Sequence, residues 1–181
     1  MTTFIITTII LLFICTILMW IINTYNKFQV YIIRINEAEA NIDAVLRKRF
    51  DLLNKSIDII KTNAKIEDDV LGQIIKLRSR KLSNFELDRK IYDGLKEFSK
   101  YKEEYPELKN SESFMKIDVE LSESEAEIVA FRKYYNDIIT DYNKLIKSFP
   151  TNTIALIFKF KSKLYFDGKD MNDDIINDFK L

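Results

Sequence analysis

The chain has 181 residues, enough for one modest domain and an appendage, and its 28 basic side chains equal its 28 acidic ones. A net charge of zero argues against nucleic-acid binding through a broad basic field. The sequence contains no histidine, which excludes Ser-His-Asp and Cys-His catalysis and imidazole metal sites. Its 3 glycines and 2 prolines offer little material for hairpin turns. We therefore expect an all-α fold with no enzymatic activity, no cofactor and no nucleic-acid partner.

The first segment is uniformly apolar. Residues 4–22 read FIITTIILLFICTILMWII and contain no charged side chain, and their number is close to the ~20 residues that a membrane-spanning helix needs. The segment lacks the basic n-region and small-residue cleavage site of a signal peptide. We predict an uncleaved transmembrane anchor over residues 1–25, with Trp20 and Tyr25 at the interface and Cys15 as an ordinary membrane residue.

The charges beside this anchor predict its orientation. Only the α-amino group precedes it, whereas five basic residues follow it: Lys27, Arg34, Arg47, Lys48 and Arg49. The positive-inside rule then places the N-terminus outside and residues 27–181 in the cytoplasm.

Apolar residues at helical spacing continue from Phe28 to Ile60 without Gly or Pro, which predicts one long helix continuous with the anchor and ending near residues 61–65. Its seam, in steps of three and four, is Ile32, Ile35, Glu39, Ile42, Leu46, Arg49, Leu53, Ser56 and Ile60.

Two shorter helices are predicted next. One carries Val70, Leu71, Ile74 and Leu77 on one side. The other starts at the capping-box pattern of residues 83–86 and ends before Pro106. Its expected apolar face is Leu87, Ile91, Leu95 and Phe98.

The last long helix has a seam that repeats every 3.5 residues, which is typical of a bundle core. The seam is Phe114, Ile117, Leu121, Ser124, Ile128, Phe131, Tyr135, Ile138, Tyr142, Leu145 and Phe149. Pro150 ends this helix, and residues 151–166 form a short amphipathic segment that either caps the bundle or touches the membrane surface. We predict an up-and-down antiparallel bundle of about four helices over residues 26–166, followed by an acidic, frayed tail at 167–181.

Four polar residues flank this seam at spacings of seven, four and seven: Glu125, Arg132, Asn136 and Asn143. Such spacings keep side chains near one line on a helix. The line could form a ligand-binding groove or a row of interhelical hydrogen bonds that fixes the register, and we favour the second interpretation.

Arg49 occupies a core position on the first seam, where an arginine needs an acidic partner or several carbonyls. We predict Glu125, which lies at the edge of the facing seam in antiparallel packing. Glu39 is the competing acid, but it lies ten residues away on the same helix.

No metal site is expected. The acidic groups at residues 67–69 and at Asp173, Asp174 and Asp178 lack calcium-loop spacing and its glycine. The dipole at a helix N-terminus suffices to explain the first group.

Three blocks of the sequence resemble the LemA family of bacterial membrane-anchored proteins. They are YNKFQVYIIRINEAEANIDAVLRKRFDLLNKSIDIIK, EEYPELKNSESFMKI and LSESEAEIVAFRKYYNDIITDYNKLIKSFP. The third is the most specific, with Glu125, Arg132, Tyr135-Asn136, Tyr142-Asn143 and Phe149-Pro150 in the family's order and spacing. The resemblance extends from the anchor to about Phe166. The chain departs from the family's pattern at Glu39, where the family has Trp, and at residues 52–56, where it lacks a proline.

The resemblance implies an N-terminal membrane helix and a helical bundle in the bacterial cell membrane, without an established activity. We expect a non-catalytic scaffold or interaction module at the cell envelope, in contact with the bilayer through residues 4–22 and with an unidentified protein partner; homo-oligomerisation stays open. The alternative is a sensory or small-ligand-binding bundle that uses the polar line on the last long helix. A membrane-bound hydrolase with paired carboxylates is a third interpretation, but the sequence arranges no two acids at an open cleft.

Overall fold

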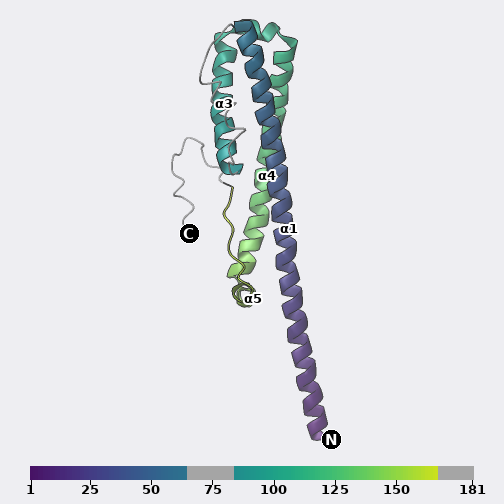
Figure 1. Cartoon of the computed structure of the whole chain (residues 1–181). Coiled ribbons are helices and arrows are strands. Elements are labelled where there is room, and N and C mark those ends of the chain that lie inside the picture. The colour runs from purple at the N-terminus through teal and green to yellow at the C-terminus, as the bar shows by residue number, and fades with distance from the viewer. Residues whose placement is uncertain (65–83, 167–181) are drawn as a thin grey trace. The chain divides into compact units, whose positions relative to one another are not determined.

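The computed structural model of the protein describes residues 1–64 and 84–166. These residues form helices and no strand (Figure 1), which confirms the predicted all-α class. The elements are α1 (Thr2–Ala64), α3 (Asn84–Glu104), the 3-10 helix η2 (Pro106–Asn110), α4 (Glu112–Lys147) and α5 (Thr151–Ile157). The predicted second helix, the acidic groups at 67–69 and 173–178, and the tail at 167–181 lie outside the described residues.

Helix α1 joins the apolar segment to the bundle without interruption. No proline removes a backbone donor or strains the helix at residues 52–56, so intrahelical hydrogen bonding continues across them. In the described chain, α1 is the one helix long and apolar enough to cross a membrane by length and composition, and residues 4–22 are compatible with a membrane anchor. Most of the predicted seam is buried, namely Ile35, Ile42, Leu46, Arg49, Leu53, Ser56 and Ile60.

The described part of the chain divides into two compact units, residues 1–37 with 136–165 (unit 1) and residues 38–64 and 84–135 with Phe166 (unit 2). In unit 2, Lys48 and Arg49 of α1 bind Glu127 and Glu125 of α4, so α1 and α4 run antiparallel. Ion pairs from Asp88 to Arg132 and from Lys102 to Asp118 show that α3 and α4 are also antiparallel. It follows that α3 runs parallel to α1 in unit 2.

The buried face of α3 differs from the predicted one. It contains Asp88, Ile91, Gly94, Phe98 and Tyr101, whereas the expected Leu87 and Leu95 are half-buried. The helix ends at Glu104, just before Pro106, as the sequence predicts.

In unit 1, the chain turns back after α4 and α5 toward α1. Phe160 stacks on Phe28 with ring centroids 4.6 Å apart, and Tyr142 meets Phe28 edge-on at 6.0 Å. The turn after α5 has Lys159 in the left-handed region (φ 58°), and the Phe160 amide donates to the Ala155 carbonyl at 2.9 Å. This is the pattern of a Schellman cap, which usually has glycine at the left-handed position.

The prediction that Phe149 belongs to the α4 seam is wrong. Helix α4 ends at Lys147, and the Phe149 side chain is 85% exposed. The apolar spacing continues past the helix end, but Pro150 prevents the helical backbone from following it.

Candidate functional site

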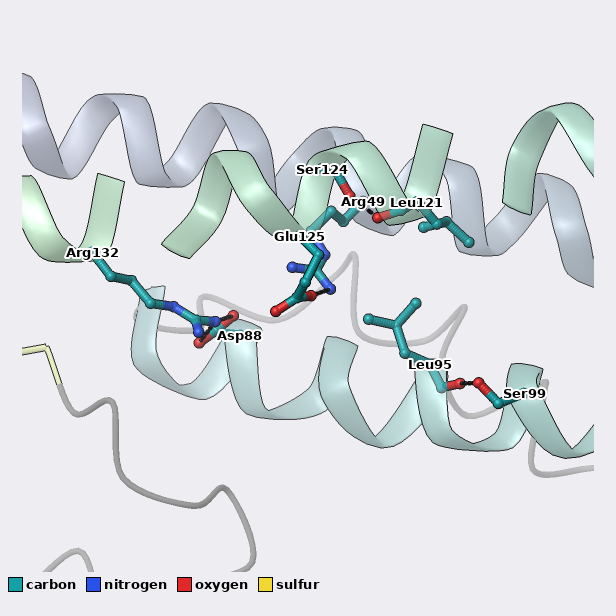
Figure 2. Close-up of polar contacts among 8 residues, drawn as sticks. All are labelled: Arg49, Asp88, Leu95, Ser99, Leu121, Ser124, Glu125 and Arg132. Atoms are coloured by element: carbon teal, nitrogen blue, oxygen red, sulfur yellow. Dashed lines mark hydrogen bonds and ion pairs between the residues drawn. The ribbon is translucent and has the colours of Figure 1, made fainter. Parts of the chain in front are cut away.

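The polar residues on the inner faces of unit 2 form two ion pairs (Figure 2). The first joins Arg49 of α1 to Glu125 of α4, the partner that the sequence predicts. The Arg49 side chain is 3% exposed, whereas that of Glu125 is 55% exposed. Glu125 therefore stays partly hydrated while its carboxylate compensates the buried positive charge of Arg49.

The second pair was not predicted from the sequence. Arg132 of α4 donates from Nη2 to both carboxylate oxygens of Asp88 on α3. The Asp88 side chain is buried and that of Arg132 is mostly so. Asp88 lies three residues before Ile91 and ten before Phe98, on the apolar face of its helix. A charged residue at a core position is the same signal that marked Arg49, and it could have revealed this pair.

The two pairs are close enough to influence each other. Burial raises the pKa of the Asp88 carboxyl above its ordinary value, and the Arg132 guanidinium opposes this rise. The charge of Arg49 also opposes it, whereas that of Glu125 adds to it. These four residues, called the charge network below, carry no net charge and connect α1, α3 and α4.

Phe166 closes one side of the charge network. Its ring centroid lies 5.5 Å from the Arg132 guanidinium carbon, a cation–π contact. The same ring stacks on Phe85 of α3 at 4.4 Å and meets Tyr135 of α4 edge-on at 6.1 Å. The Phe166 ring thus covers the largely buried guanidinium of Arg132 with an aromatic face.

Glu39, the polar residue on the first seam, interacts with Tyr135. Burial and the hydrogen bond and charge of Glu39 raise the pKa of Tyr135 to about 12. A tyrosine hydroxyl on α4 therefore accommodates a carboxylate at the position where the family resemblance leads one to expect tryptophan.

The other members of the predicted polar line lie in unit 1. Asn143 makes two hydrogen bonds with the backbone of Lys163: its Nδ2 donates to the carbonyl at 2.8 Å, and its Oδ1 accepts from the amide at 2.9 Å. The Asn143 side-chain amide thereby satisfies both backbone groups of Lys163, as a peptide group on a neighbouring strand would. Asn136 is half-buried, and its backbone carbonyl accepts a hydrogen bond from the Thr140 hydroxyl at 2.8 Å.

These contacts favour a structural role for the polar line over a ligand-binding groove. Glu125, Arg132 and Asn143 are each engaged by another part of the chain. Within residues 1–64 and 84–166, no three His, Cys, Asp or Glu side chains are grouped so that they could hold a metal ion. In the same ranges, the buried Nε donors of Arg49 and Arg132 have no hydrogen-bond acceptor, since each guanidinium uses Nη2 for its carboxylate.

Comparison with known proteins identifies the family. The model of the LemA family matches residues 38–177. The chain belongs to the LemA family. It is similar to Protein LemA of Metamycoplasma hominis, with 32% identity over 129 residues, 67% of this chain and 58% of that relative. The match confirms the resemblance seen in the sequence, and the chain spans less than two thirds of this curated LemA protein.

The LemA family match covers all four residues of the charge network, and also Asn136 and Asn143. It begins at residue 38, so the apolar segment and the Tyr25-Asn26 part of the first resembling block lie outside it. It ends at residue 177, beyond the predicted limit of Phe166.

Proposed function

We propose that this LemA-family chain is a non-catalytic, membrane-anchored helical bundle that acts as an interaction module or scaffold at the bacterial cell envelope. One observation supports this most: the charged residues of the polar line that lie in unit 2 are paired with partners on other helices. Charged side chains that are paired across helices hold those helices in register, and they are already occupied and not free to bind a substrate. The absence of histidine from the whole sequence is in agreement.

The proposed anchor is residues 4–22, with residues 27–181 in the cytoplasm. Its support is that one helix, α1, carries both the apolar segment and the first seam of the bundle. The bundle would then begin directly after the anchor, on the same helix. Attachment of an impermeant thiol reagent to Lys109→Cys in a Cys15→Ser background tests the orientation: labelling in intact cells contradicts it, and labelling only after lysis supports it.

The proposed partner surface is a second row on α4, made of Met115, Val119, Ala126 and Val129. All four are exposed, and their spacings of four, seven and three place them on one face of the helix. An exposed apolar row on a helix suits packing against a helix of another protein or of a second copy.

Photo-crosslinking tests this proposal. A photoreactive amino acid is placed at Val119 or Val129 in the full chain, native membranes are irradiated, and adducts are identified by mass spectrometry. The same protein should be captured from both positions. Lys116 is the matched control, because it is exposed on the same helix but points about 100° away from Met115. Failure to capture a reproducible adduct from either row position would count against the interaction module.

A further inference from the structure

Unit 1 exposes a group of large apolar side chains around α5. Phe149, Leu156, Ile157 and Phe158, called the α5 patch below, are all exposed, Leu156 at 81%. The opposite side of α5 is buried through Ile154 and Ala155. The short helix therefore caps unit 1 with one face and leaves an apolar face open, which is unusual for a surface that contacts only water.

The α5 patch lies beside the end of the apolar segment. The Phe158 ring centroid is 4.8 Å from that of Tyr25, and Phe160 is 5.9 Å from the same ring. Tyr25 follows Ile22, the last residue of the apolar segment, by three residues, or roughly 4.5 Å along a helix. Figure 1 shows α5 at the end of α4, next to α1. The Phe158 end of the patch thus lies beside Tyr25, about one helical turn from the predicted bilayer boundary.

The charged residues nearest to the patch in the sequence are all positive. Residues 142–165 include five lysines and no acidic residue, and residues 1–36 include Lys27 and Arg34 and no acidic residue. The five lysines, all exposed, are Lys144, Lys147, Lys159, Lys161 and Lys163. Positive and negative side chains are therefore separated along the chain, although its net charge is zero, because all 28 acidic residues lie outside residues 1–36 and 142–165.

We propose that the α5 patch inserts into the interfacial layer of the same bilayer that α1 crosses, while the surrounding lysines bind anionic phospholipid headgroups. This inference rests on the proposed anchor and adds a second membrane contact to it. Aromatic and aliphatic side chains interleaved with lysine are typical of segments that lie in the interface, at depths of about 5–10 Å. Anionic headgroups supply the complementary charge.

The backbone at Lys159 agrees with this role. A glycine would adopt its left-handed conformation without the steric cost that a lysine side chain incurs. Lysine at this turn instead supplies an exposed cation at the position between Phe158 and Phe160 in the sequence. Two separate membrane contacts, through α1 and through α5, would fix the rotation of unit 1 about the α1 axis.

Fluorescence quenching in nanodiscs tests the contact. Trp20 is the only tryptophan, so a Trp20→Phe chain with Leu156→Trp reports from the patch alone. The full chain is reconstituted into phosphatidylglycerol nanodiscs in which some acyl chains are brominated near the headgroup. We expect strong quenching for Leu156→Trp and weak quenching for the matched control Ile33→Trp, an exposed α1 position roughly 16 Å beyond Ile22.

Two outcomes separate this inference from the proposed anchor. In the first outcome, the chain stays in the nanodisc through an alkaline wash, but quenching is equally weak at both positions. This result overturns the α5 contact and leaves the anchor intact. A chain that washes out of the bilayer overturns the anchor, and this inference with it.

The lysine contribution has its own test. In phosphatidylglycerol, replacing Lys159 and Lys161 by Gln should weaken partitioning of the patch by about fivefold per charge, whereas the Arg replacements should preserve it. Quenching that is identical in phosphatidylcholine and phosphatidylglycerol, and unaffected by the Gln replacements, would overturn headgroup binding.

Discussion

Arg132 on α4 binds both carboxylate oxygens of Asp88 on α3, and the ring of Phe166 also contacts the guanidinium. The arginine is thus held by a charge and by an aromatic face at once, between two antiparallel helices of unit 2. Such a contact stabilises only one register of α3 against α4, because a shift of one residue would move Asp88 out of reach.

Removal of Arg132 should be strongly destabilising. Arg132→Met leaves Asp88 buried without its cation, which costs on the order of 3–5 kcal/mol at neutral pH. Urea unfolding of the detergent-solubilised chain, followed by circular dichroism, measures the loss. The matched control is Lys133→Met, an exposed neighbour on the same helix, and its effect should stay within about 0.5 kcal/mol. Equal losses for the two variants would contradict the importance of this pair.

Stability should depend on the protonation of Asp88. Its pKa is raised by burial, so the folded chain binds this proton more tightly than the unfolded chain does. Stability from this group is therefore present at low pH and is lost as pH rises from about 4 through the folded pKa. Asp88→Asn should flatten that slope, and Arg132→Met should extend it to higher pH. Unfolding free energies measured across this range would refute the assignment if Asp88→Asn left the slope unchanged.

The two glutamates that bind α1 should differ in importance. Glu125 compensates the buried Arg49, whereas Glu127 binds Lys48 and both of those side chains are nearly half exposed. Glu125→Gln should cost about 1.5–3 kcal/mol, and the matched Glu127→Gln should cost less than about 1 kcal/mol. The same unfolding assay compares them, and a larger effect for Glu127→Gln would be inconsistent with the buried position of Arg49.

Glu39→Gln should lower the pKa of Tyr135 from about 12, because it removes the neighbouring negative charge. Tyr142 is the internal control, since only burial raises its pKa. NMR of ring-labelled tyrosine gives both values. The sign of the linkage predicts that Tyr135 supports the fold up to about pH 10, its ordinary pKa, and that this contribution is lost between there and its folded pKa of about 12.

Asn143→Leu should release the chain that follows α5. The substitution removes both hydrogen bonds to Lys163, each worth about 0.5–1.5 kcal/mol. Hydrogen exchange at the Lys163 amide should accelerate, while exchange at the Phe160 amide, which binds the Ala155 carbonyl of the α5 cap, should change less. Uniform acceleration at both amides would show that Asn143 has no local role.

The sequence predicted those features that depend on helical periodicity. The α1 seam and the position of Arg49 within it follow from spacing alone, and two antiparallel seams bring Glu125 to Arg49. The core position of Asp88 could be found from spacing, but the choice of Arg132 as its partner depends on how α3 packs against α4. Phe166 was missed because its three contacts lie 31 to 81 residues away along the chain. Phe149 was misplaced because periodicity does not record where a helix ends.

In the proposed function, the charge network stabilises the fold, and the exposed row on α4 contacts the partner. The most direct test replaces one buried pair with apolar residues, Asp88→Leu with Arg132→Met, in a chain that carries the photoreactive amino acid at Val119. Replacing both partners avoids an unpaired buried charge, so the chain should stay folded. We predict the same crosslinked adduct in the same yield as in the unsubstituted chain. A folded double variant that loses this adduct would contradict a purely structural role for the charge network and would favour a ligand-binding role.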